Sequence, residues 1–199
     1  MLNFNVILFN DFESLDVFGP IEIIGKLNQF YKIEYYSEKG GIIRSNQNVR
    51  METLPISDIK DTGILLIPGG FGTRTEVNNQ EFIQNIRELC IDAKYVLSVC
   101  TGAALLAKTE LIKNLKATTN KIAFNWVVEQ DNEVKWIRKA RWVNDGKYYT
   151  SSGVSAGIDM TLGFVGDTFG VEVADKIAYG IEYTWNKDKE YDPFCSLSK

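Results

Sequence analysis

Residues 97–107 read Leu97-Ser98-Val99-Cys100-Thr101-Gly102-Ala103-Ala104-Leu105-Leu106-Ala107. An apolar, strand-like run leads to a cysteine, and a helix-forming run of small residues follows at once. We therefore expect Cys100 at a sharp turn between a strand and a helix, where the positive end of the helix dipole would lower the pKa of its thiol. A second interpretation stays open, because free cysteine is also among the residues most often buried as simple hydrophobes.

Outward from this turn, short apolar runs alternate with longer runs of helical periodicity. The predicted strands cover 5–9, 31–37, 63–68, 95–99 and 117–119, with hairpins at 42–44/49–52 and 140–144/148–151. The predicted helices cover 15–27, 80–93, 105–115, 122–129, 154–169 and 171–185. This alternation favours an α/β fold, a flavodoxin-like three-layer sandwich with a mainly parallel sheet and a cysteine nucleophile elbow. We expect a single domain over residues 1–199, with a loosely held tail after about residue 187.

Composition limits the classes of function. The chain has 199 residues, 45% of them hydrophobic, and a formal net charge of −4. This charge argues against a nucleic-acid partner, including at the aromatic and basic segment 136–142. We find neither a secretory leader nor an apolar run of membrane-spanning length, so we predict a cytoplasmic protein without membrane contact. The three cysteines lack a CxxC pair, so we expect reduced thiols and no metal site: Cys90, Cys100 and Cys195.

Gly69-Gly70 follows the apolar run 63–68, at the end of a strand that we expect to lie beside the Cys100 strand. Open α/β sheets bind ligands at the carboxyl ends of their strands. A backbone N–H of Gly70, together with that of Thr101, could form a two-donor oxyanion hole. The alternatives are an ordinary loop at Gly69-Gly70 and a helix-capping role for Thr101.

Asp16 is the candidate carboxylate. It lies in Leu15-Asp16-Val17-Phe18-Gly19-Pro20, and its apolar neighbours would partly desolvate it and raise its pKa, as suits a general acid and base. The competing interpretation is a helix N-cap. Glu22 in the same helix is a second possible carboxylate. The chain contains no histidine, so Cys100 has no histidine base within it.

Other polar residues have structural interpretations. Ser152 or Ser155, in the junction 151–155, is predicted to cap the following helix. Asp159 and Asp167, on an otherwise apolar helix, are predicted to face solvent or a subunit contact. Cys90 is expected in the core.

Five segments together resemble the ThiJ/PfpI superfamily, the flavodoxin-like relatives of class I glutamine amidotransferase domains. They are LDVFGP (15–20), LLIPGGFG (65–72), SVCTGAALLA (98–107), ATTN (117–120) and SSGVSAGIDM (151–160). Within that superfamily the chain is most similar to the isonitrile hydratase-like branch. The resemblance implies that Cys100 is the nucleophile, Asp16 the catalytic carboxylate, Thr101 the adjacent catalytic threonine, and Gly70 with Thr101 the backbone hole.

The resemblance implies a lyase that adds water to a small isonitrile through a cysteine thioimidate, without a metal or organic cofactor, in a homodimer. Asn120 stands where many relatives have a histidine, which weighs against peptidase or glutaminase chemistry. Two alternatives remain: a glyoxalase or deglycase acting on reactive aldehydes, and a non-catalytic thiol sensor or small-ligand-binding module. The physiological substrate and the roles of Asn120, Glu22 and residues 151–155 are not fixed by the sequence.

Overall fold

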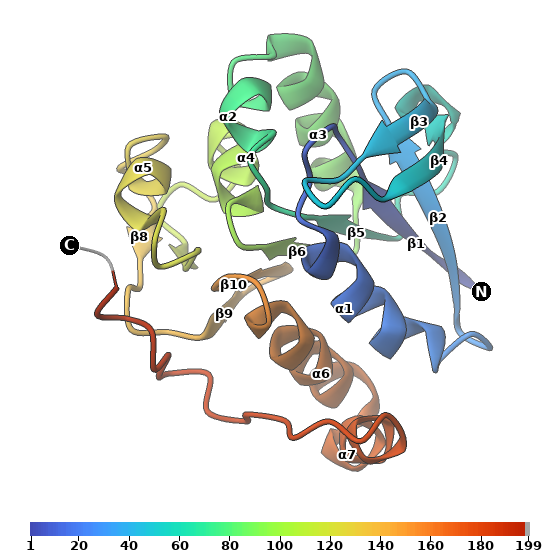
Figure 1. Ribbon diagram of the computed structural model, residues 1–199, viewed down its shortest axis with the longest axis vertical. Helices are drawn as coiled ribbons and strands as arrows, with labels where there is room; N and C mark the ends of the chain where they lie inside the picture. Colours follow the sequence, from blue (N-terminus) through green and yellow to red (C-terminus); the bar gives the residue numbers. More distant parts are fainter. Residues whose placement is uncertain (198–199) are drawn as a thin grey trace.

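The computed structural model describes residues 1–197. An eight-stranded sheet with the order β3-β4-β2-β1-β5-β6-β10-β9 crosses the middle of the molecule (Figure 1). Its strands are β1 (Leu2–Ile7), β2 (Tyr31–Ser37), β3 (Gly41–Arg44), β4 (Arg50–Pro55), β5 (Ile64–Ile67), β6 (Tyr95–Val99), β9 (Trp142–Asp145) and β10 (Tyr148–Ser151). The inner strands pair in parallel, and only the outermost pairs, β3 with β4 and β9 with β10, are antiparallel. The predicted mainly parallel sheet is confirmed.

Helices cover both faces of this sheet (Figure 1). They are α1 (Ser14–Gly25), α2 (Thr73–Glu76), α3 (Gln80–Asp92), α4 (Gly102–Lys108), α5 (Phe124–Val128), α6 (Ala156–Phe169) and α7 (Val171–Gly180). On one face α6 contacts both α1 and α7, and on the other α4 contacts α2, α3 and α5. The buried residues of the central strands are mostly apolar because both faces of the sheet pack against helices, as β5 shows with four fully buried residues.

The chain reverses direction across the sheet at β1, because β2 lies on one side of β1 and β5 on the other. Ligands of open α/β sheets bind beside such a point, outside the carboxyl ends of the strands. The loops after β1, β5 and β6 leave the sheet there. The N–H of Glu13, after β1, donates to the carbonyl of Gly69, after β5, at 2.8 Å.

Several predicted boundaries were wrong. Helix α4 ends at Lys108 instead of continuing to residue 115, because Glu110 adopts a left-handed backbone with φ 62° and the chain turns. Helix α7 ends at Gly180, shortly before Glu182 turns in the same way with φ 54°. The sequence pattern also missed three short elements: α2, the 3-10 helix η1 (Ile56–Asp58), and β8 (Lys135–Trp136), which pairs with β7 (Lys116–Ala117) in a second small sheet.

The segment after residue 187 was predicted to be loosely held; the structure instead shows hydrogen bonds and burial at residues 189–192, and residues 198–199 lie outside the described residues. The amide of Arg141 donates to the carbonyl of Lys189 at 2.8 Å, and the amide of Asp192 donates to the carbonyl of Lys139. The side chain of Asp192 is fully buried beside Arg141, with 4.0 Å between Oδ1 and Nη1. A buried carboxylate next to a buried guanidinium anchors this segment to β9.

Candidate active site

Cys100 follows β6 directly and has a left-handed backbone, with φ 57°. Its N–H lies 3.2 Å from the carbonyl oxygen of Ser151 and 3.3 Å from that of Ser152, and its own carbonyl accepts from the Thr119 hydroxyl at 2.7 Å. These bonds hold a conformation that non-glycine residues rarely adopt and that is common at functional sites. The predicted strand-to-helix turn at Cys100 is therefore present, and residues 151–152 help to hold it.

The pKa of Cys100 departs from the sequence-based expectation. Burial raises the pKa of the thiol well above its ordinary value, and the nearby Asp16 carboxylate raises it further, while hydrogen bonds from Thr101 act in the opposite direction. The side chain is only 6% exposed. The expectation of a lowered pKa was wrong, because desolvation and a neighbouring negative charge outweigh the start of a short helix.

Asp16 lies in the first turn of α1 and is fully buried. Glu13, not Asp16, occupies the N-cap position, so the capping interpretation was wrong. The Gly69 N–H donates to Asp16 Oδ2 at 2.9 Å, whereas Oδ1 accepts no hydrogen bond. Burial raises the pKa of Asp16 well above its ordinary value, with smaller opposing effects from the Gly69 amide and Cys100. The expected raised pKa is confirmed.

Thr101 and Gly70 also meet at this site, in an arrangement that the sequence did not predict. The Gly70 N–H donates to Thr101 Oγ1 at 3.0 Å, and the Thr73 hydroxyl contacts the same oxygen at 3.1 Å. Thr101 makes no side-chain cap for α4, so the capping alternative was wrong. The Gly70 donor of the predicted two-donor hole is thus engaged, and it becomes available only if the Thr101 side chain rotates.

Two glycines let these groups approach one another. A Cβ added at Gly69 would lie 2.5 Å from the Thr101 nitrogen and 2.9 Å from Asp16 Oδ2. A Cβ added at Gly153 would lie 2.0 Å from Asn120 Nδ2 and 3.3 Å from Cys100 Sγ. No side chain fits at either position without a shift. Gly153 was not among the predicted site residues, although it lies in the 151–155 junction.

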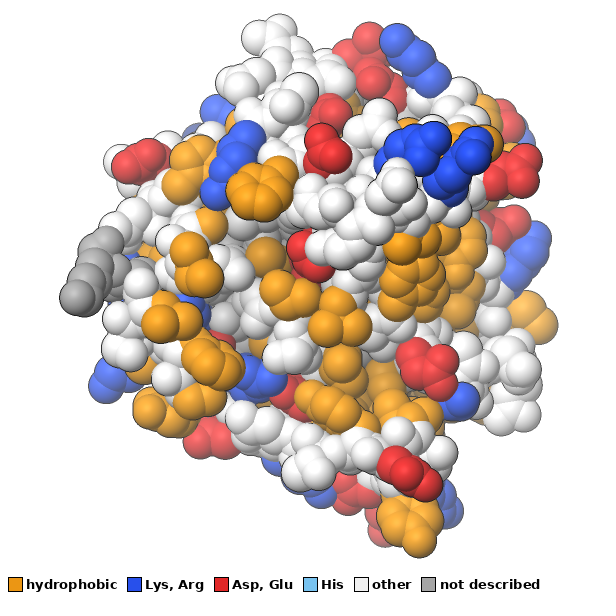
Figure 2. Space-filling model, viewed as in Figure 1, with side chains coloured by type: hydrophobic (Ala, Val, Ile, Leu, Met, Phe, Trp, Pro, Cys, Tyr) orange, Lys and Arg blue, Asp and Glu red, His pale blue; other side chains and the backbone are white. Residues whose placement is uncertain are grey.

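A cavity of about 290 Å³ is lined by Cys100, Thr101 and Gly70. Its other lining residues are Glu13, Asn46, Phe71, Arg74, Asn120, Ile122, Ala123 and Val154. Phe71 and Ile122 are 71% and 79% exposed. On the face seen in Figure 2, apolar side chains gather around a hollow in the middle of the molecule. The cavity is therefore largely apolar and suits a small organic substrate.

Glu13, Arg74 and Asn46 were not predicted as site residues. Glu13 stands only three residues before Asp16, which is the one local signal that could have found it. Asn46 arrives from the turn between β3 and β4, and Arg74 from α2, so only the tertiary fold brings them to Cys100. Asn120 lines the cavity, and its Oδ1 accepts from the Ala123 N–H at 2.9 Å.

The remaining predicted residues lie elsewhere or have structural roles. Glu22 is exposed and pairs with Lys26 at 2.7 Å, so it is not part of the site. Ser155 holds the N-cap position of α6 without a side-chain cap bond. Asp159 is fully buried against Arg141, at 2.6 Å, so its predicted exposed position was wrong. Cys90 is buried, as expected.

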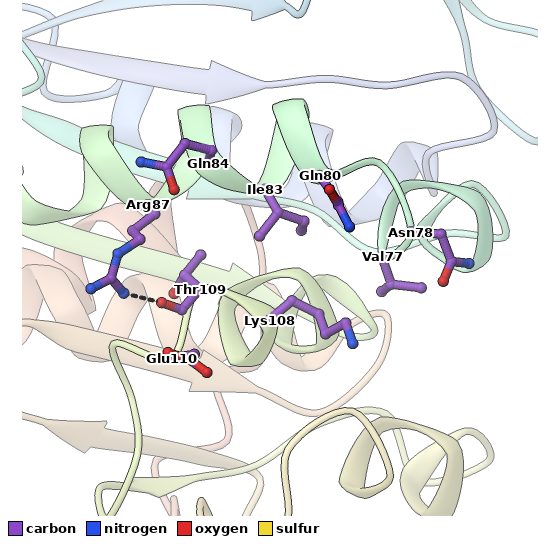
Figure 3. A pocket seen from close by; sticks show the side chains of 9 residues that line it. All are labelled: Val77, Asn78, Gln80, Ile83, Gln84, Arg87, Lys108, Thr109 and Glu110. Atoms are coloured by element: carbon purple, nitrogen blue, oxygen red, sulfur yellow. Dashed lines mark hydrogen bonds between the residues drawn. The ribbon is translucent and has the colours of Figure 1, made fainter.

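A larger cavity of about 480 Å³ lies between α3 and the end of α4 (Figure 3). Polar side chains such as Gln80, Gln84 and Lys108 line it, and Arg87 donates to the Thr109 carbonyl at its edge. It contains no cysteine or carboxylate pair, so volume alone does not locate the chemistry. Within residues 1–197 no group of three or more acidic or cysteine side chains could hold a metal, and no helix has the length and hydropathy to cross a membrane.

The chain is similar to several known proteins. It is 26% identical to an isonitrile hydratase from Pseudomonas putida over 182 residues, which cover 92% of this chain and 78% of that protein. A ThiJ/PfpI family protein from Pseudomonas syringae superposes with a TM-score of 0.84 at 24% identity, over 93% of this chain and 76% of that one. DJ-1beta from Drosophila melanogaster superposes with a TM-score of 0.79 at 17% identity, over 92% and 99%.

These likenesses confirm the flavodoxin-like fold that the five sequence segments implied. The model of the DJ-1/PfpI family matches residues 4–166, which include most of β1, the Cys100 turn and most of α6. The chain therefore belongs to the DJ-1/PfpI family.

Proposed function

We propose that this protein adds water to a small isonitrile and releases the N-substituted formamide. Two facts support this assignment: the similarity to an isonitrile hydratase, and the burial of Cys100 beside Asp16. The second carries the proposal, because it supplies a nucleophile and a proton donor with no histidine in the chain.

The two acidic groups act as a pair. Burial disfavours the charged form of each, and their charges repel when both are ionised. The pair therefore retains at least one proton near neutral pH, and that proton can reside on the thiol or the carboxyl. Transfer from Cys100 to Asp16 gives a thiolate beside a carboxylic acid, which is the arrangement that addition to an isonitrile requires.

In the first step the Cys100 thiolate attacks the terminal isonitrile carbon while the Asp16 carboxyl protonates that same carbon. A C–S and a C–H bond form, and the product is a thioimidate with the Asp16 carboxylate beside it. Asp16 then takes one proton from water as the hydroxide adds to the carbon, and the other water proton ends on the substrate nitrogen. Cleavage of the C–S bond releases the formamide and restores the original proton on the pair.

The site geometry supports this sequence. The Gly69 amide holds Asp16 Oδ2, so Oδ1, which accepts no backbone hydrogen bond, is the oxygen that would exchange a proton with Cys100. Thr101 would orient the reacting carbon and nitrogen through its N–H and hydroxyl. The apolar cavity holds the N-substituent.

The test is turnover of cyclohexyl isocyanide, with N-cyclohexylformamide quantified by chromatography. We expect product from the wild-type protein, none from Cys100→Ala, and an unchanged rate from the matched control Cys195→Ser. If the wild-type protein makes no formamide from several isonitriles, isonitriles are ruled out as its substrates. If the Cys100→Ala variant still converts the isonitrile, the covalent mechanism is ruled out.

The other candidate functions have weaker support. A peroxide sensor depends on a population of thiolate, which the raised pKa of Cys100 reduces. An aldehyde-consuming enzyme would use the same cysteine, and methylglyoxal consumption without added glutathione is its direct test.

A further inference from the structure

Among residues 1–197, the one cation that lines the cavity beside Cys100 is Arg74. Its guanidinium carbon lies 4.2 Å from the centroid of the Trp126 ring and 5.7 Å from that of Phe71. The rings come from α5 and from the loop before α2. Aromatic contacts of this kind restrain the guanidinium while leaving the N–H groups at its edge available.

No carboxylate within residues 1–197 forms an ion pair with Arg74, and its guanidinium donates no hydrogen bond to them. By contrast, Arg141 has a buried carboxylate partner. Glu13 lines the same cavity as Arg74 but accepts instead from Gln47 Nε2, at 2.8 Å. Arg74 is exposed to solvent and lines a largely apolar cavity without an ion-pair partner, so its guanidinium is accessible to an anion that enters the cavity.

The position of that charge follows from the other groups. Asp16 lies beside Cys100, so negative charge is disfavoured next to the sulfur. Glu13 also lines the cavity and repels an anion, so Arg74 is the group in the described lining that could attract one. An anionic ligand would therefore place its neutral reacting end at Cys100 and a single negative group at Arg74.

We propose that Arg74 is a specificity-determining residue that selects substrates whose N-substituent carries a carboxylate. The planar fork of guanidinium N–H groups matches the two oxygens of a carboxylate. Applied to isonitriles, the inference rests on the proposed function. The selection of anionic over neutral electrophiles at Cys100 is independent of the proposed function.

Alkylation of Cys100 tests the charge preference without any turnover. The probes are N-ethylmaleimide, which is neutral, and 3-maleimidopropionate, which carries a carboxylate at the end remote from the reacting carbons. Rates are measured by peptide mass spectrometry in a Cys195→Ser background, at low and high salt. We expect the anionic-to-neutral rate ratio to fall about fivefold in Arg74→Gln, to be partly kept in Arg74→Lys, and to lose its Arg74 dependence at high salt.

Arg50→Gln is the matched control, because Arg50 is an exposed arginine on β4 that does not line the cavity. Its rate ratio should equal that of the parent protein. An unchanged ratio in Arg74→Gln, or an equal fall in Arg50→Gln, would overturn the proposal. Thermal unfolding of each variant checks that the altered ratios come from folded protein.

Turnover separates this inference from the proposed function. We expect kcat/KM for isocyanoacetate to fall about fivefold in Arg74→Gln, and that for its neutral methyl ester to stay within twofold. If the maleimide ratio depends on Arg74 but neither isonitrile turns over, Arg74 selects anions and the isonitrile assignment fails. If both isonitriles turn over equally well in Arg74→Gln and wild type, the role of Arg74 in substrate selection fails and the hydratase assignment stands.

Discussion

Asp16 and Asp159 are both fully buried aspartates on helices, and they differ in what surrounds them. Asp159 contacts Arg141 at 2.6 Å, the Tyr183 hydroxyl at 3.0 Å and the Asn186 amide at 3.1 Å. Asp16 has one amide partner and an oxygen without any. Arg141 therefore compensates the charge of Asp159, which joins distant segments of the chain. Asp16 has no such cation and lies beside Cys100. The partners of a buried carboxylate thus indicate whether it has a structural or a catalytic role.

Removing the cation beside Asp159 should produce the largest change in stability. Arg141→Met leaves Asp159 buried without a counter-ion and removes one positive charge beside Asp192, so we expect a loss of about 3–5 kcal/mol in the free energy of unfolding. Burial already raises the pKa of Asp159, so the loss should be smaller at pH 5, where the carboxyl can take a proton, than at pH 8. Urea unfolding at both pH values measures it. A loss below 1 kcal/mol would show that the cluster is not structural.

Asp16→Asn should have the opposite pattern, with activity lost and stability kept. General acid and base catalysis contributes about a hundredfold or more, so formamide production should fall by at least about a hundredfold. Because the folded-state pKa of Asp16 is raised, wild-type stability decreases as pH rises from the unfolded value toward the folded one. The variant lacks this decrease, so it should equal or exceed wild type in stability at pH 8. Strong destabilisation of Asp16→Asn would make Asp16 a structural residue like Asp159.

The same substitution should move the titration of Cys100. The Asp16 charge contributes to the raised pKa of the thiol, so its removal lowers that pKa. The pH profile of iodoacetamide alkylation should shift to lower pH in Asp16→Asn. Glu22→Gln, an exposed carboxylate on the same helix, is the control that should leave the profile unchanged. Coincident profiles for wild type and Asp16→Asn would mean that the two groups are not coupled.

An exposed ion pair gives the smallest effect. Lys187 and Asp175 are 2.7 Å apart, and both side chains are about half exposed. Lys187→Met should cost no more than about 1 kcal/mol, because solvent screens the pair. The contrast with Arg141→Met, measured in the same urea experiment, isolates the contribution of burial. Similar losses for the two would contradict it.

The sequence predicted the parts of this structure that depend on local patterning. Periodicity located the strands 31–37 and 95–99 to the residue, and the apolar neighbours of Asp16 indicated its raised pKa. It could not predict the depth of Cys100, which depends on packing from several elements and reverses the expected direction of its pKa. Nor could it predict that Thr101 engages the Gly70 amide, since the two are 31 residues apart.

Asp159 shows the same limit from the other side. The pattern of its helix predicted an acidic residue without a partner. Its partners Arg141, Tyr183 and Asn186 come from distant parts of the chain, so the local pattern could not reveal them. Homodimer formation, cytoplasmic location and the extent of a single domain stay predictions. Sedimentation would test the first of them.

Because Asp192 is buried, proteolysis of the C-terminal segment would affect the stability of the folded protein. A cut between Tyr191 and Asp192 would take a carboxylate out of the protein interior and leave Arg141 with one fewer counter-charge. Such a cut during purification would therefore act as a core mutation and lower the melting temperature.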